Sequence, residues 1–180
     1  MDSTLITIES LDELAAFAGK GAEVAALTEA AMRGETTDYQ ASLRKRVALL
    51  KGVEAALLER VYAEKLRLAP GAERLVAASR EAGLHVLLAT GGFEFFARRL
   101  QERLKIDSIC CNRLVMVDGR LTGEVVGPAD APLVDAEGKA QALRAAWIGA
   151  LRACLLLGFA GALCAKREGV EDREIGRAHV

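Results

Sequence analysis

The chain has 180 residues and a formal net charge of −1, with 24 lysines and arginines against 25 aspartates and glutamates. Hydrophobic residues make up 52% and charged residues 27% of it, which excludes a disordered chain and predicts one domain, or one domain with an insertion. The lack of a basic surplus and an aromatic share of 4% argue against a nucleic-acid partner.

The cysteine pattern and the apolar segments predict a cytoplasmic protein that has no membrane partner. The four cysteines show no C-x-x-C spacing, so we expect reduced thiols and no structural zinc site. No secretory signal pattern is present at the start of the chain. The longest apolar stretch, residues 153–165, is shorter than the roughly 20 residues that a membrane-spanning helix needs, which favours a buried core segment.

Residues 10–66 predict one helix after another. A capping box at Ser10–Glu13 predicts the first helix, and a second is expected to run to about Met32. Another capping box at Thr37–Gln40 predicts the third helix, and residues 53–66 are amphipathic in the same way. We interpret this region as a small helical bundle.

The pattern changes after Pro70 to alternating helices and strands. A helix over 71–82 leads into a short apolar run at 85–89, which is typical of a buried parallel strand. A glycine-containing turn and a new helix follow that strand. This alternation predicts an α/β sheet in which residues 10–66 form an inserted cap, with ligands at the carboxyl ends of the strands.

The later elements are predicted from turn chemistry. Residues 107–111 are strand-like, and 114–117 and 120–126 flank Asp118-Gly119, a dipeptide that predicts a β-hairpin turn. A helix is expected over 138–148.

Several residues have a functional and an ordinary structural interpretation. Thr90-Gly91-Gly92-Phe93 is a strand-to-helix turn that can bind an anion, or simply a tight turn. Lys139 stands at a helix start, where a lysine does not help the helix dipole, or is an exposed surface lysine. Arg46 flanks an apolar stripe and can reach a cleft, or belongs to a solvated helix face. Asp2 is a loop carboxylate or part of a frayed terminus.

A series of short motifs occurs in a fixed order along the chain: MDSTLI at 1–6, Glu9, YQASLRKRVALLKG at 39–52, ATGGF at 89–93, NRL at 112–114, DGRLTG at 118–123 and DAEGK at 135–139. Together they resemble the phosphoserine phosphatases of the haloacid dehalogenase (HAD) superfamily, over about residues 1–145.

The resemblance implies an α/β fold with a HAD-like, Rossmannoid three-layer core and an inserted helical-bundle cap. The core would comprise residues 1–9 and 67–180, incomplete at both ends, and the cap residues 10–66. The implied reaction is the Mg²⁺-dependent hydrolysis of O-phosphoserine to L-serine and phosphate through an aspartyl-phosphate, a step of L-serine biosynthesis.

The resemblance also implies roles for individual residues. Asp2 matches the second aspartate of the family's Asp-x-Asp-Ser-Thr motif, which is the general acid and base and binds Mg²⁺ through its backbone carbonyl. Lys139 matches the lysine that neutralises the nucleophile and the phosphate. The phosphate-binding turn would be Thr90, Gly91 and Gly92, and the substrate-binding cap residues would be Glu9, Met32, Tyr39 and Arg46.

Two family motifs are missing from the printed sequence. The first aspartate, the nucleophile, would precede Met1, and no Gly-Asp dipeptide of the fourth motif, Gly-Asp-Gly-x-Asn-Asp, occurs. We therefore expect a truncated sequence that is inactive as given; the last six residues, IGRAHV, resemble a translated sequencing adapter and are assigned no function. The alternatives are a non-catalytic phosphate- or phosphoserine-binding remnant and a HAD phosphatase for another small phosphomonoester. The sequence leaves the oligomeric state open.

Overall fold

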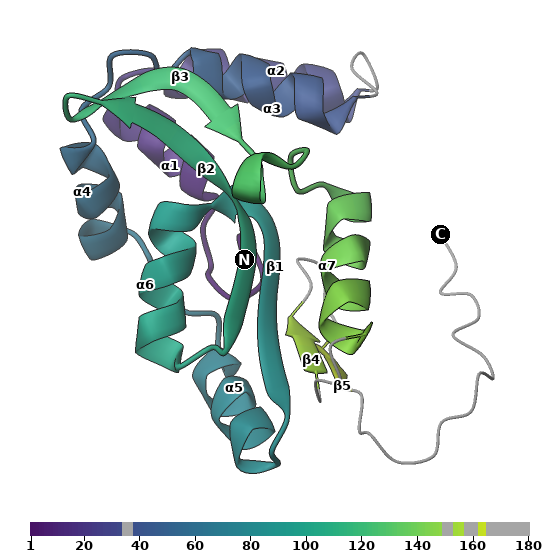
Figure 1. Ribbon diagram of the computed structural model, residues 1–180. Helices are drawn as coiled ribbons and strands as arrows, with labels where there is room; N and C mark the ends of the chain where they lie inside the picture. Colours follow the sequence, from purple (N-terminus) through teal and green to yellow (C-terminus); the bar gives the residue numbers. More distant parts are fainter. Residues whose placement is uncertain (34–37, 149–152, 157–161, 165–180) are drawn as a thin grey trace.

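The computed structural model describes residues 1–33, 38–148, 153–156 and 162–164, which form a mixed α/β fold (Figure 1). The helices are α1 (Ser10–Phe17), α2 (Gly21–Met32), α3 (Tyr39–Ala48), α4 (Ala56–Glu64), α5 (Ala72–Glu81), α6 (Glu94–Leu104) and α7 (Ala136–Ile148), with a short 3-10 turn at Pro128–Asp130. The strands are β1 (His85–Phe93), β2 (Ser108–Val117), β3 (Arg120–Val126), β4 (Ala153–Leu156) and β5 (Ala162–Cys164).

The strands form one five-stranded sheet in the order β3-β2-β1-β4-β5. The central strand β1 runs parallel to both β2 and β4, whereas β2 pairs with β3 and β4 pairs with β5 in antiparallel fashion. Helices α5 and α6 lie on one side of β1 and α7 lies on the other (Figure 1). The predicted α/β sheet is confirmed.

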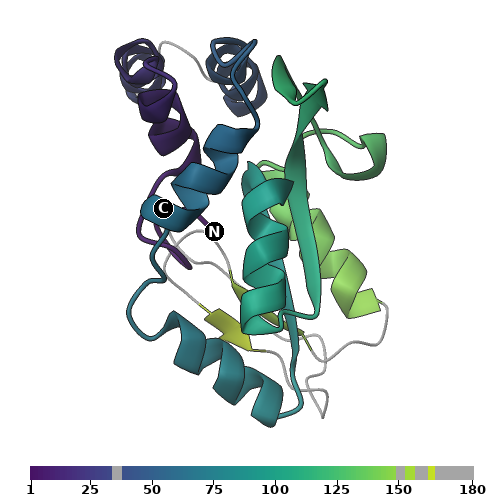
Figure 2. The same cartoon turned by 90° about the vertical axis from the view of Figure 1, so that its left-hand side faces the viewer.

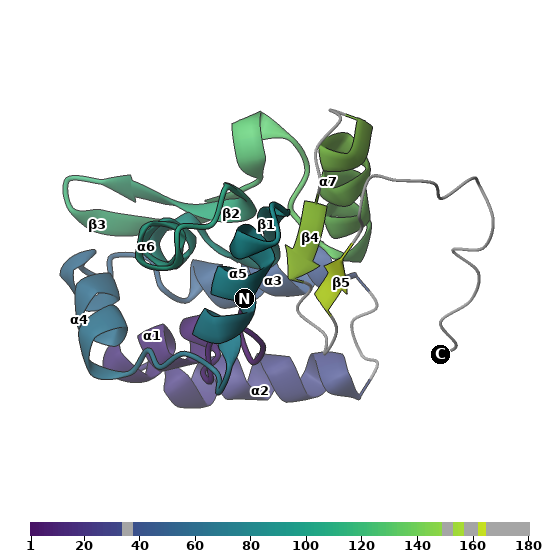
Figure 3. The same ribbon diagram turned by 90° about the horizontal axis from the view of Figure 1, so that it is seen from below.

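Helices α1 to α4 gather beside the β2–β3 hairpin and above α5 and α6 (Figure 2). Viewed from below, α1 and α2 lie on the side of the molecule away from this hairpin (Figure 3). Apolar side chains with no solvent exposure hold the group together, among them Leu14, Val47, Leu58 and Val61. Within a helix the buried positions recur at helical spacing, as at Leu43 and Val47 of α3 and at Leu58 and Val61 of α4, which is why the sequence predicted amphipathic helices here.

Backbone hydrogen bonds tie the two ends of the helical region 10–66 to each other. The Thr7 N–H donates to the Arg67 carbonyl at 3.0 Å, and the Ala69 N–H donates to the Leu5 carbonyl at 2.9 Å. Ile6 and Leu68 form an isolated antiparallel bridge between these two bonds. The chain therefore enters and leaves the helical region at one place.

The other side of the helical region pairs with the β2–β3 hairpin. The Gly52 N–H donates to the Leu121 carbonyl at 2.8 Å, and the Leu121 N–H donates to the Val53 carbonyl at 2.8 Å. The Ala55 N–H adds a bond of 2.8 Å to the Gly119 carbonyl. The loop between α3 and α4 thus lies along the tip of the hairpin.

Strand β1 continues beyond the predicted run of 85–89. Its pairing with β2 changes register after Ala89↔Cys110, and the next pair is Phe93↔Asn112. Residues 90–92 of β1 therefore lie opposite the single residue Cys111, as in an enlarged β-bulge. The glycine turn that the sequence predicted at 90–92 is this bulge. Its residues lie outside the β-ladder with β2, but strand β1 continues through them to Phe93.

Two details of the predicted elements are wrong. Ser10 is the first residue of α1 and not its cap, because the N-cap is Glu9 with no side-chain hydrogen bond, while the Ser10 N–H donates to the Asp2 carboxylate. Helix α3 is capped by Asp38, whose carboxylate accepts from the backbone N–H groups of Gln40 and Ala41. The predicted cap of α3, Thr37, lies outside the described residues.

Among the helices of the described ranges, none is long and apolar enough to cross a bilayer. Most of the predicted buried segment 153–165 lies outside those ranges; β4 and β5 fall within the segment.

Candidate active site

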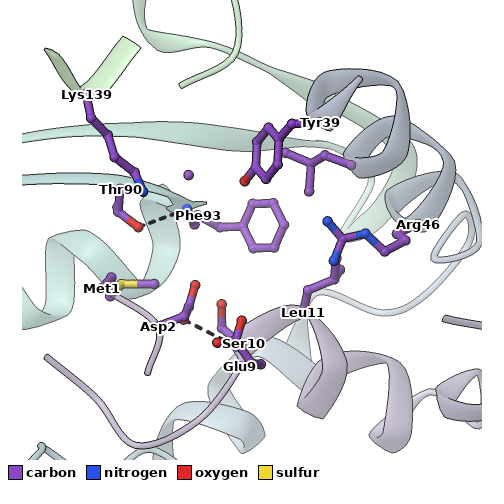
Figure 4. Close-up of a pocket in the computed structure, with 13 residues that line it drawn as sticks. Met1, Asp2, Glu9, Ser10, Leu11, Tyr39, Arg46, Thr90, Phe93 and Lys139 are labelled. Carbon is purple, nitrogen blue, oxygen red and sulfur yellow. Dashed lines mark hydrogen bonds between the residues drawn. The ribbon is translucent and has the colours of Figure 1, made fainter. Parts of the chain in front are cut away.

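A cavity of about 230 Å³ opens where the helical region meets the end of β1 (Figure 4). It is lined by Met1, Asp2, Glu9, Ser10, Leu11, Tyr39, Leu43, Arg46, Thr90, Gly91, Gly92, Phe93 and Lys139. The polar site residues that the sequence singled out all line this cavity. Met32 ends α2, and its side chain lies outside the described part of the structure.

Asp2 lies in the loop that precedes α1, with its carboxylate directed into the cavity (Figure 4). One carboxylate oxygen accepts the Ser10 N–H at 3.3 Å. The pKa of Asp2 is raised to about 6, chiefly by burial and also by the nearby Glu9, while the amino group of Met1 acts in the opposite direction. A carboxyl with this pKa can both donate and accept a proton near neutral pH, as a general acid and base must.

The bulge at Thr90–Gly92 forms the floor of the cavity. The Thr90 side chain is 2% exposed, and its hydroxyl oxygen accepts the Gly92 N–H at 2.9 Å. A Cβ atom on Gly92 would lie 2.7 Å from a carboxylate oxygen of Asp2, and a Cβ on Gly91 would overlap the Tyr39 hydroxyl. Glycine at these two positions lets the Asp2 and Tyr39 side chains approach this backbone closely.

Lys139 comes from the first turn of α7, and its side chain points toward Thr90 (Figure 4). Asp135 caps that turn, because its carboxylate accepts the Gly138 N–H at 2.9 Å while its carbonyl accepts the Lys139 N–H at 3.0 Å. This cap fixes where α7 begins, and therefore where the Lys139 side chain leaves the backbone.

Glu9, which precedes α1, and Arg46 of α3 add one acidic and one basic residue to the cavity, Glu9 near Asp2 and Arg46 at the far end (Figure 4). The Ser3 hydroxyl donates to the Glu9 carboxylate at 2.6 Å, which orients Glu9 at the start of α1. Arg46 projects from α3, and within the described residues its buried Nε has no hydrogen-bond partner. Figure 4 shows Arg46 at one end of the cavity, and Thr90 and Lys139 at the other.

Ser10 is a site residue that the sequence did not identify. Its side chain is 1% exposed and lines the cavity, and its buried hydroxyl has no hydrogen-bond partner among the described residues. The capping-box pattern predicted that Ser10 caps the first helix and so gave it a purely structural role. No remaining sequence signal could have placed it in the cavity.

The described residues do not by themselves form a Mg²⁺ site. No group of three or more His, Cys, Asp or Glu side chains with metal-binding geometry occurs in the described ranges. Mg²⁺ needs oxygen ligands in near-octahedral arrangement, and the Asp2 carbonyl that the resemblance implies is a single ligand. Further carboxylates are required to complete the site.

Comparison with known proteins points to one family. The family of haloacid dehalogenase-like hydrolases matches residues 1–157. A phosphoserine phosphatase of Polaromonas sp. is 55% identical over 79% of this chain and 61% of its own length. A phosphoserine phosphatase of Albidiferax ferrireducens is 48% identical over 89% of this chain and 65% of its own length. The chain thus spans less than two thirds of these relatives.

Solved structures agree with this relationship. A substrate-bound phosphoserine phosphatase complex superposes with a TM-score of 0.75 at 32% identity, covering 86% of this chain and 73% of that one. A phospho-aspartyl intermediate analogue of phosphoserine phosphatase gives a TM-score of 0.74 at 32% identity, with the same coverage of both chains.

Proposed function

Because this chain belongs to the phosphoserine phosphatase family of HAD-like hydrolases, we propose that its cavity binds O-phosphoserine as part of a phosphatase that releases L-serine and phosphate. Residues 1–9 and 67–180 would belong to the HAD-like, Rossmannoid three-layer core and residues 10–66 to its cap. The observation that carries the proposal is the distribution of charge in one cavity, with Thr90 and Lys139 at one end, Arg46 at the other, and Asp2 and Glu9 close together between them.

The two sides of the cavity match the two ends of O-phosphoserine. The phosphate would lie against the N–H groups of the Thr90–Gly92 bulge and the Lys139 ammonium, which supply fixed positive charge to its oxygens. The substrate carboxylate would pair with the planar guanidinium of Arg46, and its ammonium with Glu9. Tyr39, which lies over Gly91, would close the space between these groups.

Asp2 would move the protons of both chemical steps. In the first step an aspartate carboxylate that would precede Met1 forms a bond to phosphorus, the bond from phosphorus to the serine oxygen breaks, and Asp2 donates its proton to that oxygen. In the second step water attacks the aspartyl-phosphate, Asp2 takes the proton from water, and phosphate leaves. The raised pKa of Asp2 suits both transfers.

No step of this reaction is assigned to Mg²⁺, because the described residues do not complete a site for it. A polypeptide of these 180 residues would also lack the attacking carboxylate. We therefore propose that it binds the substrate without hydrolysing it.

Calorimetric titration with O-phosphoserine and with inorganic phosphate tests the assignment. Arg46→Gln should weaken O-phosphoserine binding by about tenfold and leave phosphate binding unchanged, because Arg46 would contact only the carboxylate. Lys139→Gln should weaken the binding of both. The matched control is Lys45→Gln, the same charge change at the exposed neighbour of Arg46.

Three outcomes would contradict the proposal. Equal losses for Arg46→Gln and Lys45→Gln would remove the basis for serine recognition. Stronger binding of a phosphomonoester without an amino-acid end would favour a HAD phosphatase for another substrate. Phosphate release by the unsubstituted polypeptide would show that it is not a binding remnant.

A further inference from the structure

A buried asparagine connects the two elements that form the phosphate side of the cavity. Asn112 lies in β2 with 0% exposure. Its amide nitrogen donates to the Gly91 carbonyl at 2.8 Å and to the Val134 carbonyl at 3.4 Å, and its amide oxygen accepts the Val134 N–H at 2.8 Å. Gly91 belongs to the bulge of β1, and Val134 immediately precedes the cap of α7, the helix that carries Lys139.

The bulge in β1 explains why a side chain is needed at this position. Residues 90–92 have no ladder partners in β2, so the half-buried Gly91 carbonyl takes its hydrogen bond from the Asn112 side chain instead. Asn112 is the β2 residue at which pairing resumes, opposite Phe93. Its amide replaces the missing ladder hydrogen bond.

The carboxamide matches this set of bonds. The amide group has a donor for carbonyl oxygens and an acceptor for an N–H group, whereas a carboxylate has no donor and an aliphatic side chain has neither. The orientation of the amide is fixed by its partners, since Val134 offers an N–H and Gly91 a carbonyl oxygen.

The bridge also sets how closely the two backbones approach. A Cβ atom on Gly91 would lie 3.1 Å from the Val134 carbonyl oxygen, so the bulge and the segment before α7 are in near contact. Asp135 follows Val134 directly and accepts the Gly138 N–H, so the position of Val134 also determines where α7 begins. The chain of contacts runs from Gly91 through Asn112 and Val134 to the first turn of α7.

We propose that Asn112 is a positioning residue that holds the Thr90–Gly92 bulge and Lys139 at the separation a phosphate group requires. The residue touches neither the cavity nor the substrate, and it acts through the backbone of Gly91 and Val134. The inference rests on the proposed function, because it assigns these two elements to one phosphate.

Nuclear magnetic resonance of the 180-residue chain tests the bridge and its consequence separately. The Val134 N–H belongs to no helix or strand, yet the bond to Asn112 should protect it from hydrogen exchange. Asn112→Ala should remove this protection and weaken the binding of inorganic phosphate by about tenfold, since small misplacements in such sites have large effects. Binding of L-serine, which would contact only Glu9 and Arg46, should change by less than about twofold.

Two further variants keep the test decisive if Asn112→Ala folds poorly. Asn112→Leu fills nearly the same volume without a charge but has neither donor nor acceptor, so phosphate binding and the protection of Val134 should both fall. Cys111→Ala is the matched control, because it removes a buried side chain from the adjacent position of β2 and keeps the Asn112 amide with its bonds to Gly91 and Val134. It should lower stability and leave the affinity for phosphate unchanged.

The results separate this inference from the proposed function. An exchange-labile Val134 N–H in the unsubstituted chain would overturn the bridge. Unchanged phosphate affinity in both Asn112 variants, or equal losses in the Asn112 variants and Cys111→Ala, would overturn the positioning role. If the unsubstituted chain binds neither phosphate nor O-phosphoserine, the proposed function is wrong, and the exchange of Val134 still decides whether Asn112 fixes the backbone.

Discussion

The side-chain amide of Gln40 donates a 3.0 Å hydrogen bond to the carboxylate of Asp135, across 95 residues of sequence. Gln40 belongs to α3 of the helical region, and Asp135 caps α7, which carries Lys139. One carboxylate oxygen of Asp135 accepts from Gln40 of α3, and the other accepts the Gly138 N–H of α7. The same carboxylate is therefore bonded to both helices. This bond links the cap side of the cavity to its core side.

Gln40→Leu should raise the pKa of Asp135 and weaken O-phosphoserine binding. The Gln40 bond is the largest cause that holds the pKa of Asp135 below its usual value. Losing it should reduce the affinity for O-phosphoserine more than that for inorganic phosphate, because only the former spans both sides. The pH dependence of the carboxyl resonances in nuclear magnetic resonance measures the pKa of Asp135, and calorimetric titration measures the two affinities. Gln141→Leu, an exposed position of α7, is the control, and equal effects of both variants would contradict this prediction.

The stability of the chain should fall between about pH 4 and pH 6 because of Asp2. Its pKa is about 6 in the folded chain and about 3.9 in an unfolded one, so the folded state binds more protons in this window. Folding must therefore take up a proton in this window, which becomes less favourable as the pH rises, and the penalty is complete above about pH 6, where the buried carboxyl is charged. Asp2→Asn should remove a destabilisation of roughly 1–3 kcal/mol at pH 7 and almost none at pH 4.

Urea denaturation across this pH range measures the Asp2 effect. The asparagine keeps an oxygen that can accept the Ser10 N–H, so the variant changes charge more than packing. A stability difference between the two proteins that is constant from pH 4 to pH 8 would contradict the raised pKa.

Gly91→Ala should abolish tight phosphate binding, and Tyr39→Phe should restore part of it. The new methyl group would overlap the Tyr39 hydroxyl and lie 3.1 Å from the Val134 carbonyl oxygen. Removing the hydroxyl relieves the first contact but not the second, so a double-mutant cycle should show a favourable coupling of about 0.5–3 kcal/mol. Gly138→Ala is the control, because its Cβ would meet only atoms at 3.6 Å.

The polypeptide of residues 1–180 should release no phosphate from O-phosphoserine above background in the presence of Mg²⁺. Removing a nucleophile can lower kcat by about 10⁶-fold when catalytic residues act as a unit. A chimera that adds a strand ending in aspartate before Met1, and a Gly-Asp-Gly-x-Asn-Asp segment after α7, should gain activity. The same chimera with Asp2→Asn is its control, and a colorimetric phosphate assay measures all three.

Elements with strong local signals were predictable from the sequence. Helix α5 begins one residue after the expected Gly71, and Asp118-Gly119 forms the expected hairpin turn, with positive φ angles of 48° and 73°. These angles are rare for residues other than glycine, asparagine and aspartate, which is why the dipeptide is informative. Local backbone chemistry alone decides such turns.

Features that depend on distant partners were not predictable. The expected separate strands 107–111 and 114–117 form the single strand β2, because β1 and β3 supply partners along its whole length. Asn112 lies at the point where the two predicted strands were divided. Its partners Gly91 and Val134 lie 21 and 22 residues away, and no local periodicity reports such contacts.

The joined ends of region 10–66 give the fold an unusual tolerance to changes in that region. Because Leu5, Thr7, Arg67 and Ala69 already hold the entry and exit points together, an insertion between them closes a loop whose ends are fixed. The entropy of closing a flexible loop grows only logarithmically, by about 0.6 kcal/mol for each doubling of its length. Selection can therefore lengthen, shorten or replace the helices above the cavity while the sheet beneath keeps its register, so that substrate preference and catalytic chemistry can evolve at different rates.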